Sequence, residues 1–146
     1  MEKPKTDFHR LLVGTDDSHD AQLAFHYAID YALANDAELF IVTIWESDEM
    51  NIYQALDDDY IHGEREKLVE HVQKYKEEAQ AAGVKKVETV VADGDPGKTI
   101  VNEVVPRIKP DLLIVGSLDK KGIAKRFGSQ AAYIAKYAST PVLVMR

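Results

Sequence analysis

The sequence predicts an α/β domain with a five-stranded, mostly parallel sheet covered by helices on both faces. Two observations carry this prediction. Short apolar segments alternate with helical segments along the 146 residues, and this order is typical of a parallel sheet. The apolar segments are hydrophobic throughout instead of alternating with polar residues, as strands buried on both faces require. A chain of this length supports one hydrophobic core, so we expect residues 1–146 to form a single domain.

Five strands and four helices are expected. The strands are the apolar runs at residues 10–15, 39–44, 87–92, 112–115 and 141–145. The helices are the segments with apolar residues at helical spacing, at residues 21–33, 60–82, 95–108 and 129–138. Ser18 and Asp95 are expected N-caps, and Gly83 is the expected end of the second helix. Residues 46–59 show no period, so we expect a loop there with at most a short helical turn.

Composition excludes several classes of protein. The chain has no cysteine, so it has neither a disulfide nor a thiolate metal site. Its formal net charge of −7 disfavours a broad nucleic-acid surface, because phosphate backbones attract positive fields. The apolar runs are too short to cross a bilayer, and the charged N-terminus lacks the apolar core of a signal peptide. We therefore expect a cytoplasmic protein that binds neither nucleic acid nor membrane.

A ligand is expected beyond the carboxyl ends of the strands, because parallel sheets bind ligands where the strand order reverses. The loop after the fourth strand, residues 116–129, carries four cations in an otherwise acidic protein: Lys120, Lys121, Lys125 and Arg126. The N–H groups of Gly128, Ser129 and Gln130 open the next helix and favour an anion. The alternative is an ordinary glycine-containing loop with a serine cap and solvated lysines, and the residues alone leave both interpretations open.

The loop after the first strand is a second candidate. Asp16 stands at the strand end, between Thr15 and the pair Asp17 and Ser18. A carboxylate there can accept hydrogen bonds from an adenine amino group or from ribose hydroxyls, or hold a metal through water. The alternative is that these side chains only cap the helix that follows, which explains Ser18 better than it explains Asp16.

Four short stretches, taken together, resemble the universal stress protein family over almost the whole chain. They lie at residues 13–18, 93–96, 111–117 and 139–145. The resemblance implies a Rossmann-like (adenine nucleotide alpha hydrolase-like) sandwich and a homodimer that forms through the last strand. The apolar strand 142–144 agrees with such an interface, since an exposed apolar edge invites pairing.

The ATP-binding members of this family share a glycine pattern after the fourth strand: a glycine, two residues, a glycine, nine residues, and then glycine with serine or threonine. Gly116 matches the first glycine, and Gly128 with Ser129 matches the final pair. Asp119 replaces the second glycine, and eight residues separate it from Gly128. An aspartate beside a triphosphate is repulsive unless a metal or a lysine offsets it.

The resemblance also implies a set of nucleotide-binding residues, with Mg²⁺ bound alongside ATP. Asp16 corresponds to the aspartate on the adenine side, and Ile44 to the residue that contacts adenine through its backbone. Gly94 lies at the position near the base and the ribose. The predicted set is Thr15, Asp16, Ile44, Gly94, Gly116, Ser117, Lys120, Arg126, Gly128, Ser129 and Gln130.

Three functions remain open from the sequence. The first is a regulatory or stress-response protein that binds ATP or another adenine nucleotide. The second is a member of the same family that binds no nucleotide and acts as a dimeric interaction module, which Asp119 and the shortened loop favour. A slow ATPase ranks last, because no general base or arginine finger can be named. No catalytic residue is predicted, and the five histidines show no metal-ligand spacing.

Overall fold

A computed structural model describes residues 3, 7–46, 51–117 and 128–146. Five strands form one sheet in the order β3-β2-β1-β4-β5, and every neighbouring pair is parallel. The strands are β1 (Arg10–Gly14), β2 (Glu38–Trp45), β3 (Val87–Asp93), β4 (Leu112–Gly116) and β5 (Val142–Met145). All five expected strands are present within one or two residues, and the α/β fold class is confirmed. The sheet is entirely parallel, where the sequence predicted a mostly parallel one.

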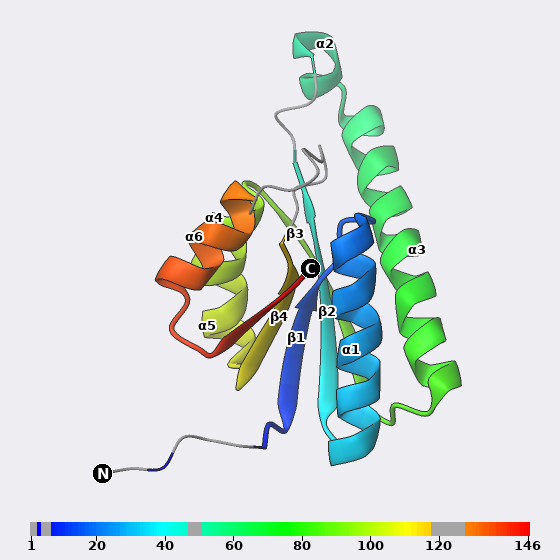
Figure 1. Cartoon of the computed structure of the whole chain (residues 1–146). Coiled ribbons are helices and arrows are strands. Elements are labelled where there is room, and N and C mark those ends of the chain that lie inside the picture. Colours follow the sequence, from blue (N-terminus) through cyan, green and yellow to red (C-terminus); the bar gives the residue numbers. More distant parts are fainter. Residues whose placement is uncertain (1–2, 4–6, 47–50, 118–127) are drawn as a thin grey trace.

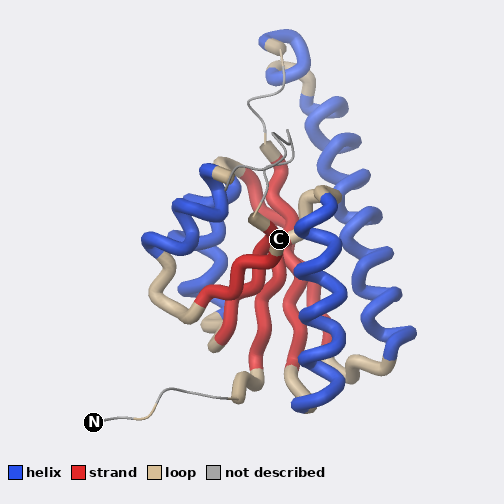
Figure 2. The backbone as a smooth tube through the Cα atoms, in the orientation of Figure 1, coloured by secondary structure: helices blue, strands red, loops and turns tan. Residues whose placement is uncertain are grey.

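Helices cover both faces of the sheet (Figure 1). One face carries α1 (His19–Asn35) and α3 (Asp58–Ala82). The other carries α4 (Pro96–Thr99), η2 (Ile100–Val104), α5 (Val105–Ile108) and α6 (Ser129–Tyr137). The short α2 (Ile52–Ala55) precedes α3 and lies beyond the sheet, as the backbone trace also shows (Figure 2). Within the described residues, none of the helices combines the length and apolar content needed to cross a membrane.

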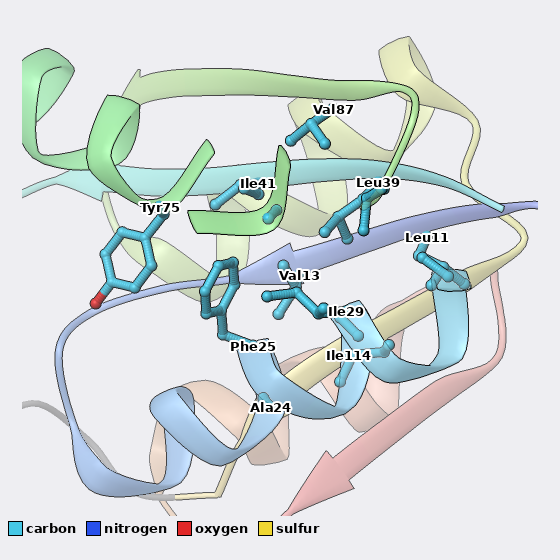
Figure 3. Packing of buried hydrophobic residues seen from close by; sticks show 14 of the residues in the cluster. Leu11, Val13, Ala24, Phe25, Ile29, Leu39, Ile41, Tyr75, Val87 and Ile114 are labelled. Carbon is cyan, nitrogen blue, oxygen red and sulfur yellow. The ribbon is translucent and has the colours of Figure 1, made fainter. Parts of the chain in front are cut away.

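The sheet separates two hydrophobic cores, and β1 contributes to both. Leu11 and Val13 pack under α1 and α3, whereas Leu12 packs on the opposite face. This alternation follows from the pleat of a strand, which points successive side chains to opposite faces. On the first face, Phe25 of α1 meets Tyr75 of α3 edge to face, with ring centroids 4.8 Å apart (Figure 3). The two helices are thus joined through buried aromatic rings.

Three helix boundaries show how capping residues decide where the helices begin and end. Ser18 accepts a hydrogen bond from the Ala21 N–H at 3.1 Å, which confirms it as the N-cap of α1. Gly83 ends α3 in the left-handed conformation, also as expected. The expected start of α3 at Tyr60 was wrong by two residues. Asp57 accepts from two backbone N–H groups of the first turn, so the acidic run supplies the cap and the first helical residues.

The helix expected over residues 95–108 is interrupted by a wide turn. Asp95 caps its start, as expected. The middle, η2, is π-helical and immediately precedes α5, which contains Pro106. Proline donates no hydrogen bond, and its ring collides with the carbonyl four residues earlier in a regular α-helix. A π-helical turn relieves that conflict, and the sequence prediction of a regular helix did not include it.

The strand order reverses at β1. The chain steps from β1 through β2 to β3 on one side, and then returns to β4 and β5 on the other. The helix that follows β1 lies on one face of the sheet, and the helix that follows β4 lies on the opposite face. The connections therefore diverge at the carboxyl ends of β1 and β4, which is where an open α/β sheet forms a crevice.

Candidate functional site

A pocket of about 350 Å³ lies at this carboxyl edge. Its walls come from the loops after β1 and β2, from α3, and from the starts of α4 and α6. Six of the residues predicted from the sequence line it together: Thr15, Asp16, Ile44, Gly116, Ser129 and Gln130. These residues are far apart in the chain, so the reversal of the strand order is what brings them to one place.

The other predicted residues have different surroundings. Gly94 has a φ of 133°, and a Cβ there would lie 2.6 Å from the Thr99 Oγ1, so the local backbone requires glycine. Ser117 is buried and does not line the pocket. Gly128 is the N-cap of α6. Lys120 and Arg126 lie outside the described residues, as does Asp119.

The end of the pocket at β1 and β2 is held by short polar contacts. The Thr43 hydroxyl donates to the Thr15 carbonyl at 3.2 Å, and the Thr15 N–H donates to the Val42 carbonyl at 2.9 Å. These bonds fix the two strand ends against each other. Asp16 follows directly, and its carboxylate accepts from the Ser18 N–H at 3.0 Å. Asp16 thus belongs to the turn before α1 and not to the helix cap, which is Ser18, and it also lines the pocket.

The opposite end of the pocket is the start of α6. Gly128 is the N-cap and Ser129 is the first helical residue, so the helix begins where expected and the serine cap of the alternative interpretation is not present. The Gln130 side chain accepts from the Gly97 N–H at 2.7 Å and donates to the Asp95 carboxylate at 3.0 Å. It ties the start of α6 to the start of α4. The first backbone N–H groups of a helix have no partner within it and carry its positive dipole end, so this side of the pocket suits an anion.

The third wall comes from α3, and sequence reasoning missed it. Leu68 and His71 both line the pocket. The apolar spacing along this helix indicates which residues face the sheet. This spacing does not show that His71, next to Val72 on the apolar side of the helix, reaches the pocket at the carboxyl edge of the sheet. Only the packing of α3 against β2 and β3 places these side chains there.

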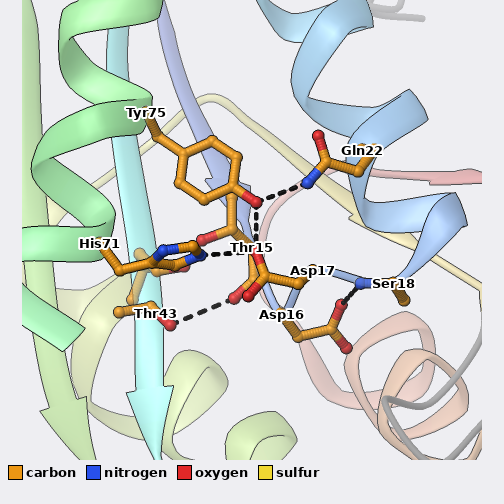
Figure 4. A network of polar contacts seen from close by, with 9 residues as sticks. Thr15, Asp16, Asp17, Ser18, Gln22, Thr43, His71 and Tyr75 are labelled. Atoms are coloured by element: carbon orange, nitrogen blue, oxygen red, sulfur yellow. Dashed lines mark hydrogen bonds and ion pairs between the residues drawn. The ribbon is translucent and has the colours of Figure 1, made fainter. Parts of the chain in front are cut away.

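A hydrogen-bond network joins this wall to the loop after β1 (Figure 4). Asp17 Oδ1 accepts from the Tyr75 hydroxyl at 2.5 Å and contacts His71 Nε2 at 2.7 Å. Gln22 Nε2 contacts the same hydroxyl at 2.6 Å. Because an ionised carboxylate only accepts, the His71 proton lies on Nε2. Asp17 has a left-handed φ of 65°, the conformation that favours glycine, and the network holds it there.

The Tyr75 hydroxyl is held in its protonated form. Burial, followed by the hydrogen bond to Asp17 and the charge of that carboxylate, raises the pKa of Tyr75 above its ordinary value of 10.0. All three causes oppose the phenolate: burial removes water from a charge, only the protonated hydroxyl can donate to Asp17, and the Asp17 carboxylate repels a second anion. Tyr75 therefore acts as a donor to Asp17 throughout the neutral range.

We expect this raised pKa to make the fold less stable in alkali. Above about pH 10, the unfolded chain releases the Tyr75 proton while the folded chain keeps it, so the free energy of unfolding falls as pH rises. Chemical denaturation from about pH 9 to pH 12 measures this slope. The variant Tyr75→Phe lacks the titrating hydroxyl and should show a shallower decline. Identical slopes for the two proteins would rule out the contribution of Tyr75.

The described lining of the pocket is acidic. It contains four carboxylates, from Asp16, Asp17, Glu46 and Asp95, and one imidazole, from His71. Among the lining residues that the structure describes, there is no lysine or arginine. Asp17 and Asp95 are already engaged by donors from the protein, which offsets part of this charge. A phosphate group here needs further compensation, from backbone N–H groups, from a bound cation or from cations of the chain.

Comparisons with known proteins agree with this architecture. The model of the universal stress protein family matches residues 7–146. A putative universal stress protein of Staphylococcus aureus is 33% identical over 141 residues, which are 95% of this chain and 84% of that protein. UspA from Lactobacillus plantarum shares the fold, with a TM-score of 0.83 at 21% identity over 97% of this chain and all of that one.

One further solved structure concerns the ligand of a relative. It is a universal stress protein in complex with cAMP, 27% identical, with a TM-score of 0.71 over 97% of this chain and 98% of that chain. The family match over nearly all of the sequence and the relative in Staphylococcus aureus together decide the assignment. This chain is a member of the universal stress protein family.

Proposed function

We propose that this protein binds an adenine nucleotide in the pocket at the carboxyl edge of its sheet and has a regulatory or stress-response role. One observation carries the proposal: six residues predicted for nucleotide binding, from four separate segments, line a single pocket. The volume, about 350 Å³, is in the range of small-molecule sites. The relative solved with cAMP supports an adenine nucleotide as the class of ligand.

The pocket has two chemically different ends, and they suggest the orientation of the ligand. Asp16 and Ile44 form the end suited to the base, where a carboxylate can accept from the adenine amino group. Ser129 and Gln130 form the end suited to phosphate, at the positive end of α6. Because the described lining is acidic, we expect ATP to bind as its Mg²⁺ complex. Lys120 and Arg126 remain predicted phosphate contacts.

Isothermal titration calorimetry with ATP and Mg²⁺ tests this function. We expect the unmodified protein to bind ATP. The Asp16→Ala variant should bind it with an affinity lower by about tenfold or more, the usual effect of losing one hydrogen bond to a charged group. Asp30→Ala is the matched control, because Asp30 is an exposed aspartate on α1 outside the pocket. Absence of heat at about millimolar ATP would contradict the proposal, since binding that weak is worth only about 4 kcal/mol.

A second candidate is the dimeric interaction module that binds no nucleotide. The acidic lining of the pocket favours it, together with Asp119 at the second glycine position of the ATP-binding pattern. The two candidates differ in a simple measurement. A nucleotide-binding protein should release adenine nucleotide when a fresh preparation is denatured, whereas this module should release none. Chromatography of the supernatant with absorbance at the adenine maximum distinguishes them.

We also propose a homodimer through β5. This strand pairs with β4 on one side and is at the end of the sheet on the other. Its residues, Val142–Met145, are apolar and only partly buried. An apolar edge strand of this kind favours pairing with a second copy. Sedimentation analysis should give a dimer at micromolar concentration, and a monomer under these conditions would exclude this interface.

A further inference from the structure

A buried polar junction lies beside the pocket, where α1, β4, β5 and α6 meet. Its centre is Ser117, which is 2% exposed, and Asp20, which is 5% exposed. The Ser117 hydroxyl donates to Asp20 Oδ2 at 2.5 Å. The Ser117 N–H donates to the Met145 carbonyl at 2.8 Å, and its carbonyl accepts from the Gly128 N–H at 2.6 Å. One residue thus connects four elements.

The backbone around this junction is closely packed. A Cβ on Gly116 would lie 2.5 Å from the Ala21 nitrogen and 2.6 Å from the Asp20 carbonyl carbon. The end of β4 therefore lies directly against the first turn of α1. Ser117 follows Gly116 in the chain, so this close approach brings the Asp20 carboxylate to the Ser117 hydroxyl.

Asp20 is not needed as the cap of α1. Ser18 already performs that role by accepting from the Ala21 N–H. A buried carboxylate is costly unless it is hydrogen-bonded, and within the part of the chain that the structure describes, the Asp20 carboxylate accepts from Ser117. The positive end of α1 also favours an acidic residue in its first turn. What Asp20 does beyond these general effects is to fix the position of Ser117.

We propose that Asp20 is a positioning residue for the phosphate end of the pocket, an inference that rests on the proposed nucleotide-binding function. Asp20 holds Ser117, and the Ser117 carbonyl holds the N–H of Gly128, the N-cap of α6. Ser129 and Gln130 follow immediately and line the pocket. The hydrogen bond that the Ser117 carbonyl accepts from the Gly128 N–H thus sets where the positive end of α6 meets the ligand.

The base end of the pocket does not depend on this junction. It is held by the bonds between Thr15, Val42 and Thr43 at the ends of β1 and β2. Loss of the Asp20–Ser117 bond should therefore affect a ligand with a phosphate more than the same ligand without one. This selectivity separates positioning from a general loss of structure, which would weaken both ligands alike.

Calorimetric titration of the full chain with AMP and with adenosine tests the inference. Asp20→Ala should weaken AMP binding by about tenfold, the effect of one misplaced charge-assisted hydrogen bond, and leave adenosine binding within about twofold. Asp20→Asn keeps an acceptor oxygen for the Ser117 hydroxyl and should restore most of the AMP affinity. Asp30→Ala, the exposed aspartate of the same helix, should change neither ligand.

Ser117→Ala removes the donor of the same bond and should also weaken the binding of AMP while leaving that of adenosine unchanged. This second variant keeps the test valid if Asp20→Ala does not fold. Equal weakening of AMP and adenosine in these variants would overturn the inference and leave the proposed function standing. If the unmodified protein binds neither ligand, the proposed function fails and the inference fails with it. An unchanged AMP affinity in both variants would also overturn the inference.

Discussion

Gly116→Ala is expected to lower the free energy of unfolding by about 3 kcal/mol, at the upper end of the usual cost of overpacking. The added Cβ would lie 2.5 Å and 2.6 Å from two backbone atoms of α1. Backbone atoms cannot rotate away as a flexible side chain can, so α1 and β4 must move apart. Urea denaturation followed by circular dichroism measures the loss of stability.

Gly63→Ala is the matched control for this substitution. Gly63 lies inside α3, and among the described residues a Cβ there would meet no heavy atom within 4 Å beyond its chain neighbours and the adjacent backbone of its own helix. Alanine loses less backbone entropy than glycine in a helix, so we expect this variant to be more stable by about 0.5–1 kcal/mol. The same chemical change should thus have opposite signs at the two positions. A stable Gly116→Ala variant would contradict the close packing of α1 on β4.

The packing of Gly116 also affects how the glycine pattern is interpreted. Gly116 matches the first glycine of the pattern of ATP-binding members, and it lines the pocket. The first turn of α1 nevertheless leaves no room for a side chain at position 116, whatever the pocket contains. Its presence is therefore explained by the fold alone. The start of α6, with Ser129 and Gln130, carries more of the argument for a phosphate.

The sequence predicted the order of the elements because the strands of a buried parallel sheet are apolar throughout. The side-chain acceptors of Ser18 and Asp95 predicted those two helix caps, and the conformational freedom of glycine predicted the end of α3 at Gly83. The start of α3 was placed too late, since helical spacing of apolar residues begins only after the acidic first turn. The wide turn at η2 was missed because it depends on how a helix accommodates Pro106.

The candidate site was predictable where it depends on loops at strand ends. Asp16 and Ser129 follow from the rule that ligands bind beyond the carboxyl edge of a parallel sheet, whereas Ile44 was implied by the resemblance to the family. His71 could not be found in this way, because it lies in the middle of a long polar helix. Its place in the pocket results from the packing of α3 on the sheet and from the hydrogen bond to Asp17. Both are tertiary contacts between residues far apart in the chain.

Phe25→Ala is expected to cost about 4 kcal/mol, within the usual range for deleting a buried aromatic ring. Phe25 is fully buried in the core between the sheet and the helices α1 and α3. Deleting the ring leaves a cavity and removes the edge-to-face contact with Tyr75. Denaturation curves of the variant measure this cost. Leu33→Ala is the control on the same helix; Leu33 is 44% exposed, so we expect a cost below about 1 kcal/mol.

The effect of Phe25 should extend to the pocket through Tyr75. The Tyr75 ring packs on Phe25, and its hydroxyl donates to Asp17 in the pocket wall. Residues in direct contact are not energetically independent, so Phe25→Ala and Tyr75→Ala combined should cost about 1 kcal/mol less than the sum of the single variants. Strict additivity would show that the two rings stabilise the fold separately. Coupling of the expected size would show that the ring contact itself stabilises the fold, and Tyr75 links that contact to Asp17 in the pocket wall.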